Sequence, residues 1–292
     1  MDNINVIINY HRFLKRKNYS KNTLRNYMNT LKHFVLWVDV PIEKVSPKMV
    51  LSFIDHLLDN NLKPKTINCY INSIRKFYDY LIEEEQIPLL LPVKRRYALR
   101  LSKPLPRYLK DEDIPKLFKT INSKRDRAMF MIMLRCGLRV EEVAHLTMDA
   151  LDLPRSQLFV YEGKGSKDRV VYLSNDAKKA LIDYLEVRPS CRIKRVFLVE
   201  KGRFKGKPIQ VRGIQHCMQS YSKKAGLKVS CHQLRHTMAT QLLNADADLV
   251  TIQDLLGHAQ IRTTQRYCRV SNLKVQRDYQ KAIGKVISRH NI

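Results

Sequence analysis

The side chains best suited to chemistry gather in residues 230–269. In this stretch His232 and Arg235 are separated by three positions, and Tyr267 follows His258 by nine positions. Two imidazoles, a guanidinium and a phenol suit an anionic substrate and a tyrosine nucleophile. The stretch therefore predicts a site that holds a phosphate and attacks it with a phenolic oxygen.

The first pair must be presented by a helix. Ser230 followed three residues later by Gln233 forms a capping box, which begins a helix at this point. On that helix His232 and Arg235 stand at i and i+3, so their side chains share one face. Apolar residues fall on other faces and can anchor the helix in a core. The basic pair is therefore expected to point outward.

A second helix is expected between Asp248, a natural N-cap, and Gly257, a natural C-terminal stop. His258 directly follows this stop, so the end of the helix should hold it at a fixed position. Tyr267 comes later, at the end of the run TTQRY.

The pair His232 and His236 offers an alternative, a zinc site, because histidines at i and i+4 share a helix face. In a zinc protease helix a glutamate follows the first histidine as general base, and here Gln233 occupies that position. The sequence therefore disfavours a metal site, and no cofactor is expected.

The motifs HQLRH, LLGH and TTQRY, in this order and at close spacing, resemble the C-terminal signature of the tyrosine recombinases, also called the integrase family. In that family the motifs run H-x-x-R, L-G-H and a terminal tyrosine. The resemblance implies that Tyr267 cuts a DNA strand, holds it as a 3′-phosphotyrosine without metal or nucleotide, and returns it to a hydroxyl group. The function implied is site-specific DNA recombination.

Two motifs earlier in the chain extend the resemblance. The run CGLRVEE resembles the family's G-L-R-x-x-E motif, which implies that Arg139 is a catalytic arginine held by Glu142 one turn later. Residues 157–173 predict a β-hairpin around GKGS, whose lysine, Lys164, matches the family's catalytic lysine. Lys167 is the competing lysine and is expected to contact a phosphate or a groove instead.

The resemblance also implies how charge and protons move. Arg139 and Arg235 would offset the charge that develops on the phosphate oxygens. Lys164 would protonate the leaving 5′ oxygen, and His232 would accept the proton of the phenol, whose ordinary pKa is about 10. His258 would hydrogen-bond the same phosphate.

A formal net charge of +27 on 292 residues indicates a polyanionic partner. Basic residues exceed acidic ones in both halves of the chain, so both halves are expected to meet nucleic acid. No apolar run approaches about 18 residues, which argues against a membrane protein. The sequence shows no secretory signal and no C-x-x-C pair, so we expect a cytoplasmic protein with reduced thiols.

An ungapped internal repeat shapes the N-terminal part of the chain. The segment from Asn22 aligns with the segment from Lys65, each has apolar residues at helical spacing, and a further helix is expected after Ser46. These features predict a compact helical module over residues 1–97. The resemblance equates it with the core-binding domain of the family.

The rest of the chain divides into a basic, proline-bearing linker at 98–108 and a catalytic domain at 109–292. The expected fold is therefore mainly α with a small β-sheet, of the α+β class. Because ten extended residues span about 33 Å, the linker allows the C-shaped clamp around DNA that the resemblance implies.

Polar and basic residues near helix starts and in basic turns are the candidates for DNA contacts, since cations and N–H groups there favour phosphates. These candidates are Thr23, Arg25, Lys65, Asn68, Arg75, Arg107, Lys167, Arg203, Lys205 and Lys207.

The expected partner is double-stranded DNA with paired inverted half-sites, bound by a dimer on one site and a tetramer in the synapse. An amphipathic segment after Tyr267 is expected to form a helix that docks on a neighbouring subunit. A type IB topoisomerase and a non-catalytic DNA-binding regulator remain as alternatives. A metal-dependent nuclease would need an acidic cluster that these motifs lack.

Overall fold

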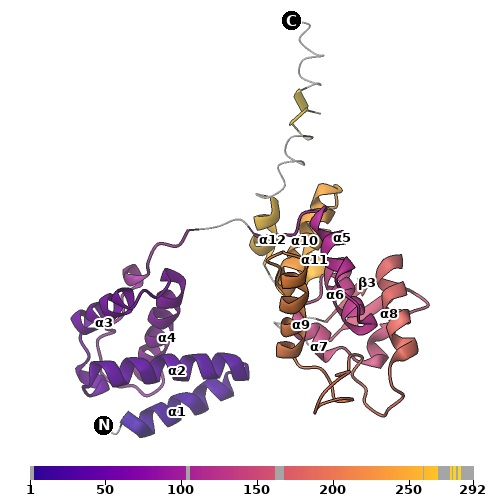
Figure 1. The fold of residues 1–292 in the computed structure, drawn as a ribbon. Coiled ribbons are helices and arrows are strands. Elements are labelled where there is room, and N and C mark those ends of the chain that lie inside the picture. Colours follow the sequence, from indigo (N-terminus) through magenta and orange to yellow (C-terminus); the bar gives the residue numbers. More distant parts are fainter. Residues whose placement is uncertain are drawn as a thin grey trace, which may run out of the picture. The chain divides into compact units, whose positions relative to one another are not determined.

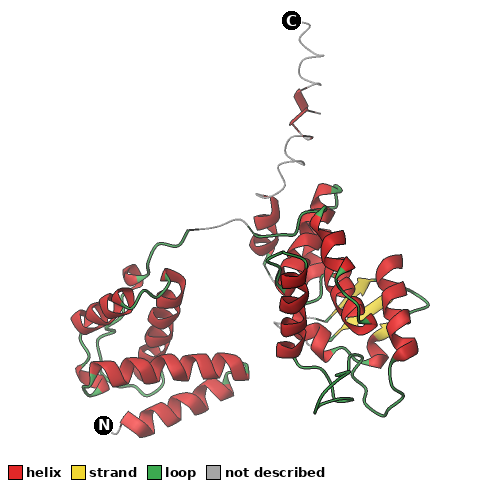
Figure 2. Ribbon diagram, in the orientation of Figure 1, coloured by secondary structure: helices red, strands yellow, loops and turns green. Residues whose placement is uncertain are grey.

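The chain forms two compact units, Met1–Lys103 and Pro104–Ile292 (Figure 1). The computed structural model describes residues 3–102, 106–161, 168–258 and 260–268, and the single positions 277, 279, 280, 282 and 283. Helices make up most of the described residues, and one three-stranded sheet lies in the second unit (Figure 2). This confirms the expected mainly α fold with a small β-sheet.

The described part of the first unit is helical. Its helices are α1 (Asn3–Arg16), α2 (Lys21–Val38), α3 (Pro47–Asp59) and α4 (Pro64–Glu83), with 3₁₀ turns at Ile42–Lys44 and Arg95–Tyr97. Ser20 and Ser46 cap α2 and α3 by accepting backbone N–H groups, and proline opens α3 and α4. The two halves of the sequence repeat are thus α2 and α4, which pack against each other around buried phenylalanine and tyrosine rings.

The second unit surrounds a small antiparallel sheet. Its strands are β1 (Leu151–Asp152), β2 (Gln157–Val160) and β3 (Arg169–Tyr172), and they lie in the order β1-β2-β3. The helices before and after the sheet are α5 (Asp113–Lys119), α6 (Lys124–Cys136), α7 (Val140–His145), the 3₁₀ turn Met148–Ala150, α8 (Asn175–Val187), α9 (Val211–Lys224), α10 (Cys231–Asn244), α11 (Leu249–Leu256) and α12 (Ile261–Cys268). The hairpin expected around Lys164 corresponds to β2 and β3, although its tip, residues 162–167, lies outside the described residues.

Helix α6 forms the centre of this unit, because it packs against both α8 and α10. Nearly all of its residues are buried, so no polar stripe is left for solvent. It ends at Gly137, whose φ of +67° lies in the left-handed region, and a Cβ there would come within 2.9 Å of Leu256 Cδ2. Because Gly137 has no side chain, the end of α6 can pack against α11. Arg139 then follows at the start of α7.

A separate small core joins α10, α11 and α12. It contains Met238, Leu243, Ile252, Leu256 and Tyr267, all nearly inaccessible to solvent. The capping box at the start of α10 and the Asp248 cap of α11 are present as the sequence predicts. The α12 helix was not expected, and it carries Tyr267 into this core.

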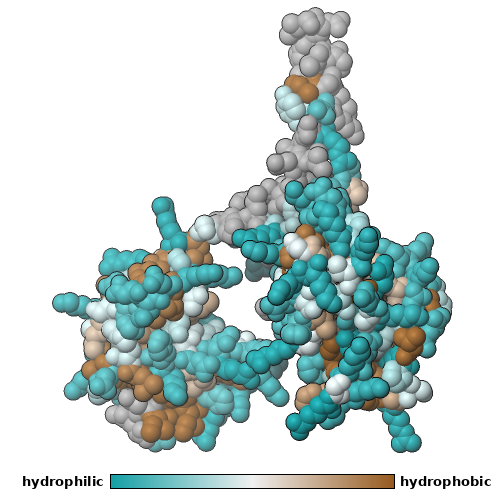
Figure 3. Space-filling model, in the orientation of Figure 1, coloured by the Kyte–Doolittle hydropathy of each residue, from teal (hydrophilic) through white to brown (hydrophobic). Residues whose placement is uncertain are grey.

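Figure 3 shows hydrophilic side chains over much of the visible face of each unit, with smaller hydrophobic patches among them. Within the part of the chain that the structure describes, none of the helices combines the length and apolar character needed to cross a membrane.

Candidate active site

Two arginines anchor the site, and main-chain carbonyls hold both. The Arg235 guanidinium is buried, with its residue only 1% exposed, so the expectation that it points outward is wrong. It donates to the carbonyl oxygens of Gly137, at 2.5 Å, and of Leu256. Arg139 donates through Nη2 to the carbonyl oxygen of Gly257 at 3.3 Å. The ends of α6 and α11 therefore fix the two guanidinium groups.

Glu142 orients one of these arginines. Its carboxylate accepts the backbone N–H of Arg139 at 2.8 Å and the Arg139 Nη1 at 2.6 Å, which closes a capping box at the start of α7. Arg169 donates to the same carboxylate from Nη1 at 3.0 Å and Nη2 at 2.7 Å. Burial alone would raise the pKa of Glu142, but the Arg169 and Arg139 hydrogen bonds and charges outweigh it and lower that pKa to about 2.

Arg169 is a site residue that the sequence analysis missed. Its side chain is 7% exposed, and its Nε donates to the carbonyl oxygen of Leu255 at 2.9 Å. It lies at the first position of β3, within the predicted hairpin and shortly after its tip in sequence, so it connects that hairpin with α7 and α11. A lone arginine at a strand start carries no spacing signal, which explains the omission.

His258 stands at the end of α11, as expected. Gly257 before it has a φ of +61°, the backbone N–H of His258 donates to Gln253, and its Nδ1 lies 2.9 Å from Thr264 Oγ1. Burial, followed by the charges of Arg235 and Arg139, lowers its pKa to about 4. The imidazole is therefore neutral at neutral pH and can offer one N–H to a phosphate.

Tyr267 lies on α12 and is 2% exposed. Its ring is nearly parallel to that of His258, with centroids 6.5 Å apart. Its phenolic oxygen lies 2.7 Å from Nδ1 of His236, a hydrogen bond between α12 and α10. The sequence analysis considered His236 only as a possible zinc ligand, and His236 is the second residue of this cluster that it missed.

The predicted catalytic residues can now be placed. Arg139, Arg235, His258 and Tyr267 form one cluster, linked by the contacts described above and by the electrostatic effect of Tyr267 on Arg235. His232 is exposed, and its ring contacts His236 edge to face with centroids 4.3 Å apart. Lys164 and Lys167 lie outside the described residues.

Burial and the neighbouring Arg139 lower the pKa of Arg235 to about 9. The guanidinium therefore keeps its positive charge at neutral pH, although it is surrounded by carbonyl oxygens instead of a carboxylate. Arg139 and Arg235 are thus two positive groups close to each other. Together they raise the electrostatic potential of the site, which favours binding of an anion.

The predicted DNA contacts differ in what their side chains do. Asn68 exchanges two hydrogen bonds with the backbone of Leu99, at 2.8 and 2.9 Å, and Arg75 donates to the carbonyl oxygen of Val93 at 2.8 Å. Both hold the segment that follows α4. Thr23 bonds the capping hydroxyl of Ser20 at 2.9 Å. The exposed candidates are Arg25, Lys65, Arg107, Arg203, Lys205 and Lys207.

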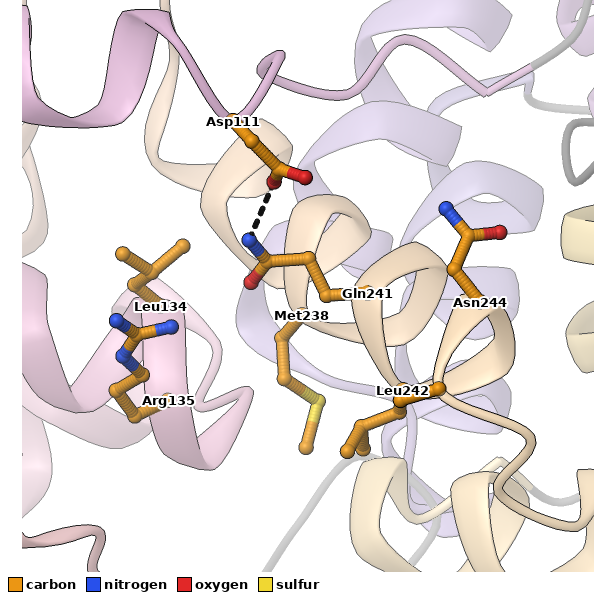
Figure 4. Close-up of a pocket in the computed structure, with 8 residues that line it drawn as sticks. Asp111, Leu134, Arg135, Met238, Gln241, Leu242 and Asn244 are labelled. Carbon is orange, nitrogen blue, oxygen red and sulfur yellow. Dashed lines mark hydrogen bonds between the residues drawn. The ribbon is translucent and has the colours of Figure 1, made fainter. Parts of the chain in front are cut away.

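A pocket of about 430 Å³ lies beside a different face of α10 (Figure 4). Asp111, Arg135, Met238 and Gln241 contribute to its lining, and Gln241 donates to Asp111 at 2.7 Å. It includes none of the predicted catalytic side chains. Among the described residues no cluster of histidine, cysteine and carboxylate side chains could hold a metal.

Comparison with known proteins identifies the family of this chain. Residues 107–274 match the phage integrase family, and residues 7–85 match the phage integrase N-terminal SAM-like domain. The chain belongs to the phage integrase family. Tyrosine recombinase XerC of Thermodesulfovibrio yellowstonii is 33% identical over 266 residues, which cover 87% of this chain and 88% of that protein. Tyrosine recombinase XerA of Thermococcus kodakarensis is 30% identical over 279 residues, with 95% of each chain covered.

Solved structures share the fold. The Tn1549 transposon integrase in complex with transposon right end DNA has a TM-score of 0.76 at 17% identity, and the match covers 95% of this chain and 98% of that one. The XerH recombinase bound to a palindromic difH substrate has a TM-score of 0.74 at 19% identity, with 90% and 80% covered. Together with the named relatives, family membership confirms a site-specific recombinase of the tyrosine type and disfavours a topoisomerase or a regulator without catalysis.

Proposed function

We propose that this recombinase cuts and rejoins DNA through a covalent bond between a 3′ phosphate and the phenolic oxygen of Tyr267. One observation carries the proposal. The phenol shares a single cluster with His258, Arg139 and Arg235, and the turns that end α6 and α11 fix both guanidinium groups. A phosphorus atom held by these cations would be open to the phenolic oxygen.

Positive charge exceeds negative charge at this site. Glu142 is shared between Arg139 and Arg169, so its single charge offsets only one of them, and Arg235 bonds to carbonyl oxygens. In the transition state of phosphoryl transfer, extra charge gathers on the non-bridging oxygens of the phosphate. Arg139 and Arg235 would stabilise that charge, and His258 would donate a further hydrogen bond.

In the cleavage step a bond forms between the phenolic oxygen and phosphorus, and the bond from phosphorus to the 5′ oxygen breaks. Lys164 is proposed to give the leaving 5′ oxygen its proton. An imidazole of α10 takes the proton of the phenol, a role that the family resemblance assigns to His232. A 5′ hydroxyl from a partner strand reverses the step, and exchange between two duplexes passes through a Holliday junction.

The proposed substrate is double-stranded DNA with paired inverted half-sites, bound by a dimer on one site and by a tetramer in the synapse. A lambda integrase dimer bound to a core site, with a TM-score of 0.73 at 18% identity, and XerH on its palindromic substrate support the proposed dimer on paired half-sites. The segment 269–292 is proposed to dock on a neighbouring subunit. Only positions 277, 279, 280, 282 and 283 of that segment are described.

A suicide substrate tests the nucleophile. On a duplex nicked just past the scissile phosphate, the released fragment diffuses away and a covalent protein–DNA adduct accumulates. We expect the parent protein and the control Tyr172→Phe, on an exposed tyrosine of β3, to form the adduct, and Tyr267→Phe to form none. An adduct that persists in Tyr267→Phe would exclude this tyrosine as the nucleophile.

A further inference from the structure

The hydrogen bond of the Tyr267 phenol goes to His236, although the family motif singles out His232. Nδ1 of His236 and the phenolic oxygen are 2.7 Å apart. The planes of the two rings are inclined at 58°, with centroids 5.5 Å apart, so the rings are not stacked. We propose that His236 is the group that accepts the phenolic proton of Tyr267 during DNA cleavage, an inference that rests on Tyr267 being the nucleophile.

Helix α10 holds His236 within hydrogen-bonding distance of the Tyr267 phenol, the position that a proton acceptor requires. His236 directly follows Arg235, so the helix that buries the phosphate-binding guanidinium also sets the His236 backbone. The capping box of Ser230 and Gln233 holds the start of that helix, with Gln233 accepting the Ser230 backbone N–H at 2.7 Å. The His236 side chain is partly buried, and the unprotonated nitrogen of a neutral imidazole can accept a proton.

The neighbouring charges favour transfer of the proton away from the phenol. Arg235 lies close enough to Tyr267 for their charges to interact, so it stabilises the phenolate that forms. The exposed ring of His232 packs edge to face on His236, with centroids 4.3 Å apart.

The step balances in atoms and electrons. The O–H bond of Tyr267 breaks, and its proton forms an N–H bond at Nδ1 of His236. An electron pair of the phenolic oxygen forms the bond to phosphorus. The bond between phosphorus and the 5′ oxygen breaks, and that oxygen keeps the electron pair and takes a proton from a separate donor. In rejoining, His236 returns a proton to the phenol.

The decisive variant keeps the hydrogen bond and removes the basic nitrogen. In His236→Asn, the side-chain amide occupies nearly the place of Nδ1 and can still bond the phenol, but it cannot accept a proton. We expect adduct formation on the nicked substrate to slow by about 10² to 10⁴-fold, the usual contribution of general base catalysis. The matched control is His216→Gln, at an exposed histidine of α9, which should cleave at the parent rate. A rate for His236→Asn within threefold of the parent would overturn the proposal.

A more acidic nucleophile separates a chemical defect from a structural one. When a fluorinated tyrosine replaces Tyr267, the phenol ionises more readily and needs less help from a base. We expect this replacement to restore at least tenfold of the rate that His236→Asn loses. An unchanged deficit would mean that His236 only supports the fold, and it would overturn the proposal.

A substrate with sulfur in place of the leaving 5′ oxygen identifies which proton transfer is affected, because a thiolate leaves without an acid. We expect it to rescue Lys164→Ala and to leave His236→Asn slow; rescue of His236→Asn would contradict its role as base. Tyr267→Phe forms no adduct on any of these substrates if the nucleophile is correct. A failure of the proposed function is therefore distinguishable from a failure of the His236 assignment.

Discussion

Glu142 accepts hydrogen bonds from the guanidinium groups of Arg139 and Arg169. The orientation of these two arginines therefore depends on its carboxylate. Its side chain is 7% exposed, as is that of Arg169. In Glu142→Gln the two arginines lose their shared counter-charge. We expect the free energy of unfolding to fall by about 3 to 5 kcal/mol, the usual cost of removing one partner of a buried ion pair. Chemical denaturation measures this change, with the exposed neighbour Glu141→Gln as control.

The same carboxylate gives a pH dependence with a defined sign. Its pKa is lowered from 4.5 to about 2 in the folded chain, so its stabilising effect is complete above pH 4.5 and is lost as pH falls toward 2. The parent should therefore lose stability over this window more steeply than Glu142→Gln does. Equal slopes for the two proteins would show that the carboxylate is not ionised and paired as the structure indicates.

His258 gives a pH dependence of the same sign at higher pH. Its pKa is lowered from 6.5 to about 4, so the unfolded chain binds a proton that the folded chain does not, and stability falls as pH drops from 6.5 to 4. We expect His258→Gln to remove about 1 to 2 kcal/mol of that loss, after allowance for partial exposure of the ring. Unfolding measured at pH 7 and at pH 4.5 tests this, and His216→Gln should leave the difference unchanged.

Sequence patterns predict where helices begin and end better than they predict which side chains from different elements contact each other. The caps of α10 and α11 lie at Ser230 and Asp248 as expected, because capping is a local interaction. Arg169 and His236 gain their contacts with the site only when β3 packs against α7 and α11 and when α12 packs against α10. Such long-range contacts leave no spacing signal in a single sequence.

The end of α6 shows how one backbone position controls the contact between two elements. Gly137→Ala would be strained by its positive φ and would also press a Cβ against Leu256 and Met238. Gly226 has a similar φ of +68°, but a Cβ there would meet nothing within 4 Å, so Gly226→Ala carries the strain alone. We expect Gly137→Ala to cost about 1 to 3 kcal/mol more than the control, the typical penalty of overpacking, in thermal unfolding.

Adduct formation by Gly137→Ala and Gly226→Ala tests whether the turn at the end of α6 also affects the active site. The Gly137 carbonyl accepts a hydrogen bond from Arg235, so a shift of this turn moves the guanidinium as well. Gly137→Ala should therefore cleave more slowly than Gly226→Ala at a temperature where both are folded. Equal rates would mean that the turn at the end of α6 serves the fold and not the site.

At the scale of the whole molecule, the charge of +27 is spread over two units, and the proposed clamp requires both to touch one duplex. Exposed Arg25 in the first unit and exposed Arg203 in the second are predicted phosphate contacts. Each substitution, Arg25→Gln or Arg203→Gln, should reduce the slope of log affinity against log salt concentration by about 1, and the double variant by about 2. The control Lys116→Gln removes an exposed lysine that pairs with Asp113 at 2.8 Å and should leave the slope unchanged. If only the Arg203 substitution changed the slope, the first unit would not reach the duplex through α2, and the clamp would need a different contact surface.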